Sequence, residues 1–364
     1  MKVVLAPNAF KGSLTAEQAA TAMAAGVRRV QPTAEIVKSA MADGGEGTLD
    51  IIVDALNGVR ENVPIHTVGA VPYGVLRDET CVIEVAKIVG PQVKAIPAHL
   101  RTTHVLGEFL RQLLDRGRRR FLMGLGGSIT NDAGAGMLSA LGMRCFDKTG
   151  SVLALNPLTL GHVDKIDFTY IDSRLRASDI IVMADVNNLL YGERGATFMF
   201  GPQKGLAPDE LAHIDVNIAH FAGLADAWAG HVYSREPGSG AAGGLGYALQ
   251  LLGGKYVSGA EHVAELIGLD THLVSADWVL TGEGKSDFQT LQGKAPFIVA
   301  QHAAKFQVPV TLVSGSVDEA SLPRLTEHFQ GCYSIMDAAM RIEEAMSSAS
   351  RLISNRVAQL TRVL

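Results

Sequence analysis

Short apolar runs alternate with longer amphipathic stretches at the start of the chain. Residues 3–6 form an uninterrupted apolar run, which is typical of a strand buried on both faces. Between residues 15 and 30 the apolar positions recur at helical spacing, after a threonine and a glutamine that are placed to cap a helix. A second strand at 35–40 precedes a second helix that begins at Thr48. The order strand, helix, strand, helix predicts a parallel α/β unit.

The C-terminal part of the chain follows the same pattern. Apolar runs at 278–280 and 309–313 predict strands on either side of a helix at 295–306. A short strand at 332–335 and a final amphipathic helix from about Met336 to the end complete this part. We therefore expect the two ends of the chain to form halves of one parallel sheet.

The middle of the chain differs, because residues 62–84 are extended and rich in turn residues such as proline. Helices at 102–116 and 133–141 and strands at 121–124 and 180–184 follow. This change indicates a second α/β domain inserted into the first. With 364 residues and about 100–200 residues per domain, the chain has room for two domains. The predicted boundaries are 1–62 plus 276–364 for the first domain and 63–275 for the inserted domain.

Composition excludes several classes of protein. Hydrophobic residues make up 47% of the chain and the formal net charge is −5, which argues against a disordered chain and against a dedicated nucleic-acid binder. The three cysteines lie far apart in the sequence, so we expect neither a disulfide framework nor a zinc site. The apolar stretches are too short for a membrane span or a signal peptide, so we expect a cytoplasmic protein.

Glycine is unusually frequent in this chain. It occupies 39 of 364 positions, which is about 11% against an average near 7%. The glycines show no collagen-like period and lie between apolar runs rather than in low-complexity segments. We therefore expect several backbone positions that need unusual geometry or a close approach to a ligand.

Several loops share one design, in which an apolar strand is followed by glycines with small or acidic residues and then by a helix. Such loops point backbone N–H groups at a ligand near a positive helix end, which suits phosphate. The strongest example is 124–136, where Gly126 and Gly127 would let the backbone approach an anion and Ser128 would add a donor. Asp132 in the same loop could hold Mg²⁺ or cap the following helix, and a simple strand-to-helix turn is the alternative.

Two further loops carry a similar but weaker signal. One places Asp43 and Glu46 on either side of Gly44 and Gly45 at the start of a helix. Phosphate or Mg²⁺ binding competes there with a capped helix whose first turn is acidic. The other loop, 281–287, contains Gly-Lys-Ser but lacks the first glycine of a nucleotide-binding P-loop, so by itself it is weak evidence.

Single residues near strand ends are further candidates. Asp185 ends a predicted strand, where catalytic carboxylates often lie in α/β proteins. Lys204 could steady a phosphate or lie in a surface turn. Lys11 occupies the first loop of the sheet, which is a common position for a cation that binds a substrate. The glycine-rich segment 237–246 could be a flexible linker, a ligand-binding loop or a closely packed helix start.

Together these motifs resemble the bacterial type I glycerate kinases over essentially the full length of the chain. Each motif is modestly specific, but their occurrence in order along one chain is highly specific. The chain has Asn8 and Ala9 where many relatives have Asp-Ser, so no carboxylate is available at position 8. The segments that carry the resemblance are 6–14, 41–48, 124–136, 184–188, 200–205, 237–246, 282–284, Asp287, 289–290 and 293–296.

The resemblance implies an α/β fold in which a Rossmann- or flavodoxin-like parallel-sheet domain is interrupted by a second α/β domain, with the active site in the cleft. It implies ATP-dependent phosphorylation of D-glycerate, usually to 2-phosphoglycerate, with Mg²⁺. The expected partners are D-glycerate and ATP, without nucleic acid or membrane, in a monomer or homodimer. The alternatives are a kinase that forms 3-phosphoglycerate or acts on another small hydroxy acid, and a non-catalytic cytoplasmic sugar-acid-binding protein.

Phosphoryl transfer mainly requires that the reactants are positioned and that the charge on the transferred phosphate is neutralised. We therefore rank the candidate residues by these two roles. Asp185 is the first choice for the carboxylate that orients or deprotonates the substrate hydroxyl, and Asp43 is the second. Lys11 and Lys294 are candidates for binding the carboxylate of glycerate. The full expected set comprises Asp185, Asp43 and Lys11 as catalytic residues; Gly44, Gly45, Gly126, Gly127, Ser128, Lys204 and Glu283 as phosphate- or ATP-binding residues; Lys11, Asn187, Lys294 and Asp287 as substrate-binding residues; and Asp132 and Asp185 as metal ligands.

Overall fold

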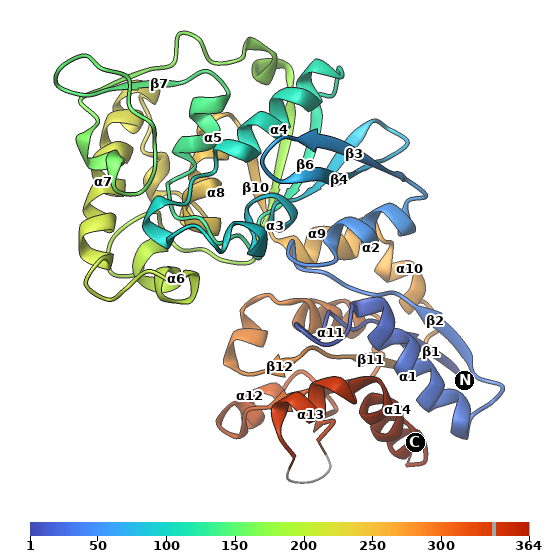
Figure 1. Ribbon diagram of the computed structural model, residues 1–364. Helices are drawn as coiled ribbons and strands as arrows, with labels where there is room; N and C mark the ends of the chain where they lie inside the picture. Colours follow the sequence, from blue (N-terminus) through green and yellow to red (C-terminus); the bar gives the residue numbers. More distant parts are fainter. Residues whose placement is uncertain (337–339, 364) are drawn as a thin grey trace. The chain divides into compact units, whose positions relative to one another are not determined.

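The structure is a computed structural model that describes residues 1–336 and 340–363 of the chain (Figure 1). Within these residues, no helix combines the length and the apolar character that a membrane span requires. Contacts between residues divide the chain into two compact units. Unit 1 consists of Met1–Asp43, Asp50–Leu56 and Ser258–Leu364, and unit 2 consists of Gly44–Leu49 and Asn57–Val257.

This division differs from the predicted domain boundaries in three segments, one of which is 57–62, predicted for the first domain but grouped with unit 2. Residues 258–275, which the sequence pattern placed in the inserted domain, group with unit 1. The short segment Gly44–Leu49, predicted to belong to the first domain, groups with unit 2. The folding of either unit as an independent domain stays a prediction.

Unit 1 contains a five-stranded sheet whose strands all run parallel. It joins strands from both ends of the chain, because the first strand pairs with one strand close behind it and with another from the C-terminal part. This confirms the predicted single parallel sheet. In spatial order the strands are β15 (Gly331–Ser334), β13 (Val310–Ser314), β11 (Trp278–Thr281), β1 (Lys2–Leu5) and β2 (Glu35–Lys38).

Helices cover both faces of this sheet, which explains why the strand sequences are uninterruptedly apolar. Val3 and Leu5 point into one apolar core with helices α1 (Ala16–Val30) and α14 (Ala349–Thr361), which lie side by side (Figure 1). Val4 points into the core on the opposite face. Because side chains alternate along a strand, a strand between two helical layers needs apolar residues at every position.

The remaining elements of unit 1 correct one prediction. The sequence pattern predicted a single helix from about Met336 to the end, but two helices occur, and residues 337–339 lie outside the described residues. The break falls at Ser348, whose φ of −103° and ψ of 6° leave the helical region. The further elements are α9 (Gly259–Leu266), α10 (Leu269–Leu273), α11 (Ala295–Lys305), α12 (Leu322–Leu325), α13 (Ile342–Ser347), β12 (Lys285–Ser286) and β14 (Ser316–Val317).

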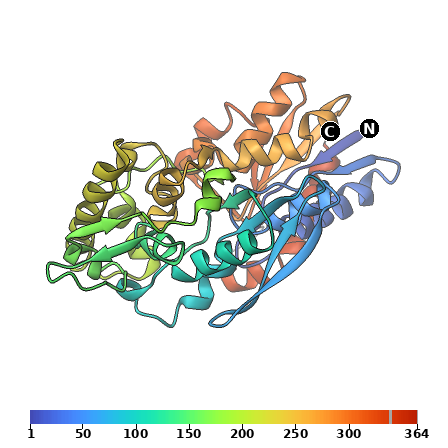
Figure 2. The ribbon, with the colours of Figure 1, turned by 90° about the horizontal axis from the view of Figure 1, so that it is seen from above.

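Unit 2 contains a six-stranded mixed sheet. Its four strands at one side are parallel, whereas β3, β4 and β5 pair antiparallel. Figure 2 shows β3 and β4 as a long twisted hairpin. The predicted extended region at 62–84 is thereby confirmed. In spatial order the strands are β10 (Lys255–Val257), β9 (Asp179–Met183), β6 (Arg120–Gly124), β5 (Thr80–Glu84), β4 (Gly69–Val75) and β3 (Val59–Ile65).

Helices pack against the sheet of unit 2 around one large apolar core. The predicted helices at 102–116 and 133–141 are present, although the second is shorter than expected. All three cysteines are free, as predicted. The elements are α2 (Thr48–Ala55), which begins in unit 2 and ends in unit 1, α3 (Ala86–Val89), α4 (His104–Asp115), α5 (Ala135–Ala140), α6 (Ala196–Lys204), α7 (Leu211–Ala229), α8 (Ala241–Leu251), β7 (Arg144–Phe146) and β8 (Lys165–Asp167).

Candidate active site

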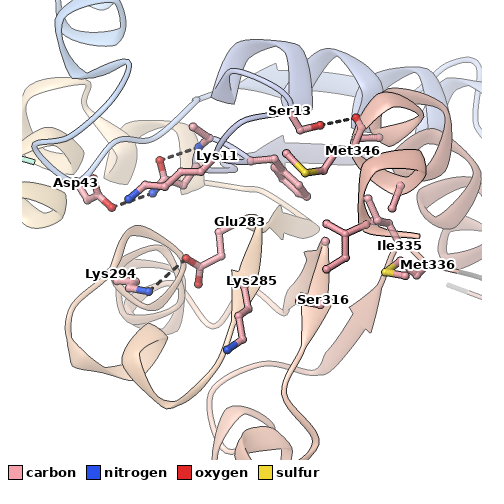
Figure 3. A pocket seen from close by; sticks show the side chains of 18 residues that line it. Lys11, Ser13, Asp43, Glu283, Lys285, Lys294, Ser316, Ile335, Met336 and Met346 are labelled. Atoms are coloured by element: carbon pink, nitrogen blue, oxygen red, sulfur yellow. Dashed lines mark hydrogen bonds and ion pairs between the residues drawn. The ribbon is translucent and has the colours of Figure 1, made fainter. Parts of the chain in front are cut away.

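The carboxyl ends of the parallel strands in unit 1 surround a cavity of about 570 Å³ (Figure 3). Loops that follow β1, β2, β11, β13 and β15 all contribute to its wall. Open parallel sheets commonly bind ligands at this edge. The lining residues are Asn8, Ala9, Phe10, Lys11, Ser13, Asp43, Glu283, Gly284, Lys285, Lys294, Gly315, Ser316, Ile335, Met336, Ile342, Ala345, Met346 and Ala349.

One end of the cavity, which we term the charged end, is formed by Lys11, Asp43, Glu283, Lys285 and Lys294 (Figure 3). Four of these five residues were predicted as site residues, from three separate loops. The fold therefore brings together motifs that lie more than two hundred residues apart in the sequence.

The loop after β1 orients Asp43 through the side-chain amide of Asn8. The Nδ2 of Asn8 donates a hydrogen bond to Asp43 Oδ2 over 3.1 Å, and Asn8 Oδ1 accepts one from the backbone N–H of Ala9 over 2.7 Å. Lys11, three residues further on, is exposed at the cavity. Asn8 thus orients the carboxylate of Asp43 without adding a negative charge of its own.

Glu283 is a buried acid with fixed orientation. Its side chain is almost inaccessible, and its Oε1 accepts hydrogen bonds from Ser286 Oγ over 3.2 Å and from Thr290 Oγ1 over 2.7 Å. Lys294 Nζ lies 3.9 Å from the other carboxylate oxygen. Burial raises the pKa of Glu283 above its ordinary value, and the nearby lysine partly opposes this rise.

Asp287 has a local structural role. Its Oδ1 accepts a hydrogen bond from the backbone N–H of Gln289 over 2.9 Å and caps a short helical turn at 288–292. Its other oxygen lies 3.1 Å from Nζ of Lys285, which itself lines the cavity. Substrate binding by Asp287 stays a prediction.

Ile335, Met336 and Met346 lie at the opposite end of the cavity (Figure 3), and Ile342, which also lines it, lies one turn before Met346 on a helix; we term these four residues the apolar end. The first two follow β15 and the other two lie on α13. Sequence reasoning placed none of these four residues in a functional site. The sequence contains little that marks these residues as functional, because apolar residues after a strand and on a short helix are equally typical of a hydrophobic core.

A second cluster of predicted residues lies in unit 2. The segment that contains Gly44 and Gly45 lies against the loop after β6, where the backbone N–H of Gly126 donates to Gly44 O over 2.9 Å. A Cβ on Gly44 would lie 2.7 Å from the carbonyl oxygen of Met183, and one on Gly126 would lie 2.5 Å from Gly45 Cα. Glycine is therefore required for this close backbone approach. The two predicted glycine loops form one surface.

Glu84 completes this surface and was not predicted. It is buried at the end of β5, and its Oε2 accepts hydrogen bonds from the backbone N–H groups of Gly47, over 3.2 Å, and Leu49, over 3.4 Å. A carboxylate at the start of α2 satisfies donors that a helix leaves unpaired. The signal in the sequence is an acidic residue directly after an apolar run, the same signal that singled out Asp185.

The loop after β6 contains buried polar side-chain atoms that have no hydrogen-bond partner in the part of the chain that the structure describes. Within the described residues, Ser128 Oγ, Thr130 Oγ1 and Asn131 Oδ1 are buried and make no hydrogen bond. Nearly all buried polar atoms in folded proteins are hydrogen-bonded to protein or water. Three such atoms in one loop mark a place that a polar ligand or water would occupy, which supports the ligand-binding interpretation of this loop.

Asp132 is held by structural hydrogen bonds. It is fully buried, and its Oδ2 accepts from Thr103 N over 2.7 Å, Thr103 Oγ1 over 2.9 Å and Gly136 N over 3.2 Å. Its Oδ1 accepts from Gly134 N over 3.2 Å. Burial raises the pKa of Asp132 and these hydrogen bonds oppose the rise. The contacts favour the capping alternative, and metal binding by Asp132 stays a prediction.

Lys204 lies inside the protein, so the alternative of a surface turn is wrong. It is 7% exposed at the end of α6, and its Nζ donates to the carbonyl oxygen of Thr130 over 2.8 Å. Burial lowers the pKa of Lys204 to about 7. Lys204 therefore braces the backbone of the loop, and a direct contact with phosphate stays a prediction.

Asp185 and Asn187 lie at the same sheet edge. Asp185 follows β9 and is half-buried, and Asn187 is exposed. The adjacent loop is anchored there, because Leu125 N donates to Met183 O over 3.1 Å. Among the residues described, no group of three acidic, histidine or cysteine side chains could hold a metal ion.

The glycine-rich segment 237–246 packs closely, so the linker alternative is wrong. It runs into α8, where residues 242–244 have positive φ values. Gly243 O accepts a hydrogen bond from Ala133 N over 3.0 Å, and a Cβ on Gly243 would lie 2.1 Å from Thr130 O. This segment forms a backbone support beneath the loop after β6.

Comparison with known proteins gives consistent matches over the whole chain. A family model described as the glycerate kinase family matches residues 3–364. Glycerate kinase of Bacillus subtilis (strain 168) is 39% identical over 360 residues, covering 96% of this chain and 94% of that protein. Glycerate 2-kinase of Escherichia coli (strain K12) is 35% identical over 362 residues, covering 96% and 94%. A crystal structure from Salmonella typhimurium LT2, assigned as glycerate kinase 2, is 35% identical, has a TM-score of 0.81 and covers 100% of this chain and 98% of that chain.

Proposed function

Since the chain belongs to the glycerate kinase family, we propose that it transfers the γ-phosphoryl group of ATP to D-glycerate and forms 2-phosphoglycerate. The observation that carries this proposal is the extent of the match, which spans residues 3–364 and so includes both clusters of polar residues. Relatives named glycerate kinase and glycerate 2-kinase support the substrate and the hydroxyl that is phosphorylated.

Unit 1 would supply positive charge for this reaction. Phosphoryl transfer depends on groups that position the reactants and neutralise the charge on the transferred phosphate. We propose that Lys11 and Lys294 bind anionic groups of the substrates at the charged end of the cavity. Asp43 and Glu283, which lie beside them, would set the orientation of these lysines.

Unit 2 would supply neutral donors and one reactive carboxylate. We propose that the backbone around Gly44, Gly45, Gly126 and Gly127, together with Ser128, cradles a phosphate group. Asp185 would orient the attacking hydroxyl and accept its proton, because its side chain is half-buried directly after β9, at the carboxyl end of a parallel strand. Asn187 would add a hydrogen bond to glycerate.

Membership of a kinase family implies that ATP is the phosphoryl donor. We propose that Mg²⁺ accompanies it, since Mg²⁺ usually binds one or two carboxylates together with substrate phosphates and water. Asp185 fits this role better than Asp132, because Asp185 is half-buried directly after β9, whereas Asp132 is fully buried. Bound there, the ion would neutralise charge on the phosphates.

We propose that unit 1 is a Rossmann- or flavodoxin-like domain interrupted by an inserted unit 2. The all-parallel sheet, with β1 between β2 and β11, supports this assignment. A monomer or homodimer is the expected assembly. Light scattering coupled to gel filtration measures it directly.

The test is to incubate the protein with ATP, Mg²⁺ and D-glycerate and to measure ADP together with the position of the new phosphate by ³¹P NMR. We expect 2-phosphoglycerate. Formation of 3-phosphoglycerate would overturn the assigned hydroxyl while keeping the enzyme class. Binding of glycerate without any ADP from a panel of hydroxy acids would instead identify a non-catalytic sugar-acid-binding protein.

A further inference from the structure

We propose that the apolar end of the cavity in unit 1 binds the adenine base of ATP, and that the triphosphate reaches the lysines of the charged end. This inference rests on the proposed function, because it names where one of the two substrates binds. It concerns four residues without a role so far: Ile335, Met336, Ile342 and Met346.

The two ends of the cavity differ in chemistry as the two ends of a nucleotide do. In Figure 3, Lys11, Asp43 and Lys294 lie at one end, and Ile335, Met336 and Met346 lie at the other. A purine has large apolar faces, and a triphosphate is strongly anionic. Nucleotide-sized sites are typically lined by apolar side chains with a few polar groups that fix orientation.

The size of the cavity also favours a nucleotide over the smaller substrate. At about 570 Å³ it lies within the range of about 300–1,000 Å³ in which proteins bury ligands much larger than a three-carbon acid. Glycerate carries a carboxylate and two hydroxyls and has no apolar surface to match Ile335 and Met336. Burial of apolar surface would therefore stabilise bound ATP and contribute little to bound glycerate.

The polar groups along the cavity fit the rest of the nucleotide. Three lysines, Lys11, Lys285 and Lys294, line it, and two of them are balanced by the nearby acids Asp287 and Glu283. Such lysines can exchange an acidic neighbour for a phosphate oxygen. This assigns Lys11 and Lys294 to the triphosphate of ATP rather than to the carboxylate of glycerate.

A hydroxyl lies between the two ends. Ser316, on β14, separates the lysines from Ile335 in Figure 3, and its backbone N–H is already used, because it donates to Gly284 O over 3.1 Å. Ser316 also lines the cavity, so we assign its hydroxyl to the ribose. The order of apolar side chains, hydroxyl and lysines follows the order of base, sugar and phosphates.

The first experiment measures binding of ADP and of inorganic tripolyphosphate by calorimetry to the double variant Met336→Ala/Ile342→Ala. Ile342 is 69% exposed and Met336 is half-buried, so truncation should leave the fold intact, which circular dichroism checks. We expect the Kd of ADP to rise about tenfold and the Kd of tripolyphosphate to stay within about twofold, because apolar contact with the base alone is lost.

A matched control removes an exposed apolar side chain elsewhere. Val232→Ala in unit 2 truncates a residue that is 54% exposed, and it should change neither affinity. An unchanged affinity of the double variant for ADP would overturn the proposal. An equal loss of affinity for ADP and tripolyphosphate, or no ADP binding by the unmodified protein, would overturn it as well.

The second experiment needs no variant. The unmodified protein is photolabelled with 8-azido-ATP, with excess ATP as competitor, and the modified peptide is identified by mass spectrometry. We expect competitor-sensitive label within residues 331–351, which include the apolar end. Label confined to peptides of unit 2, or no competitor-sensitive label, would overturn the proposal.

A parallel turnover assay separates this inference from the proposed function. Unmodified protein that phosphorylates D-glycerate but is labelled elsewhere by 8-azido-ATP would keep the function and refute the adenine site. Protein that is labelled at residues 331–351 but produces no ADP with glycerate would keep the nucleotide site and refute the function.

Discussion

Both clusters of polar residues lie at the carboxyl ends of parallel strands, but they differ in whether their charged side chains are exposed or buried. In unit 1 the charged side chains face a cavity, and Lys11 is exposed there. In unit 2 the charges in and against the loop after β6 are buried: Asp132 in the loop is fully enclosed, and Lys204 at the end of α6 is 7% exposed. The buried polar atoms without partners in that loop, such as Ser128 Oγ, are neutral.

The difference shows that an acid or a lysine beside a glycine loop has two possible uses. An exposed charge can act on a ligand, whereas a fully buried charge must first be satisfied by the protein, because removal from water is strongly unfavourable. The carboxylate oxygens of Asp132 accept hydrogen bonds from backbone N–H groups of the turn before α5, and Lys204 Nζ donates a hydrogen bond to the carbonyl oxygen of Thr130. The predictions below test whether burial separates chemical roles from structural ones.

The largest effect is expected at Asp185, which is half-buried directly after β9 in unit 2. Asp185→Asn should lower kcat by about 10²–10⁴-fold, because an amide cannot accept the proton of the attacking hydroxyl. Steady-state kinetics with ATP and D-glycerate measure this. Asp209→Asn, at an exposed position in unit 2, is the control and should match the wild type. Turnover of Asp185→Asn at the wild-type rate would remove Asp185 from the chemistry.

A pair of substitutions compares the two regions directly. Asp132→Ala should lower the free energy of unfolding by about 3 kcal/mol, because it leaves buried donors on Thr103, Gly134 and Gly136 without an acceptor. Asp43→Ala should change the free energy of unfolding by less than about 1 kcal/mol but should reduce activity, since Asp43 is partly exposed at the cavity. Urea denaturation and turnover together give the comparison. If Asp132→Ala proved as stable as the wild type, its structural role would be refuted.

An intermediate effect is expected at Lys11. Lys11→Ala should raise the KM for ATP about tenfold, because an exposed cation contributes a charge-assisted contact to the phosphates. Raising the ionic strength should reduce the difference in KM for ATP between the variant and the wild type, because salt screens the charge of Lys11. Lys165→Ala, an exposed lysine in unit 2, should leave the KM unchanged. A KM for ATP that Lys11→Ala does not alter would contradict the role of the charged end.

The most gradual effect concerns the pH dependence of stability and Lys204. Burial lowers the pKa of Lys204 to about 7, whereas an unfolded lysine titrates near 10.4. Between these values the unfolded chain binds a proton that the folded chain lacks. The free energy of unfolding should therefore rise with pH, by up to about 1.4 kcal/mol per pH unit.

Below about pH 7 both states hold the proton, and this contribution to the slope disappears. Lys204→Met fills a similar volume without titrating. Urea denaturation at several pH values from 7 to 10 should show the wild type gaining stability relative to Lys204→Met as the pH rises. Parallel curves for the two proteins would show that Lys204 stays protonated in the folded state.

The elements that the sequence predicted best are the strands of the parallel sheets. A strand between two helical layers is apolar at every position, and such runs at Val3–Ala6 and Trp278–Leu280 are easily recognised. Helix α7 at 211–229 was not predicted, because its apolar residues are spread around the helix and alanine contributes little contrast. The break at Ser348 was also missed, since the apolar pattern continues on both sides of it.

The sequence predicted individual site residues, but it did not predict which of them lie together in the structure. Local motifs identified Lys11, Asp43 and Glu283, yet their convergence on one cavity depends on strand order, which no single motif contains. The role of Asp132 was ambiguous for a similar reason. The donors that saturate it include Thr103, nearly thirty residues earlier in the chain, and burial cannot be read from a loop sequence.

The place of β1 in its sheet has a consequence for the order in which the protein folds during synthesis. Val3 pairs with Trp278, so the first strand emerges from the ribosome 278 − 3 = 275 residues ahead of one of its two neighbours. At about 5–20 residues per second, this delay is on the order of 10–60 s. Residues 57–257 are complete 278 − 257 = 21 residues earlier, which is about 1–4 s before that time. The nascent chain must therefore carry the apolar run Val3–Ala6 with one edge of its strand unpaired through most of its translation, which makes slow synthesis and premature termination a hazard for aggregation.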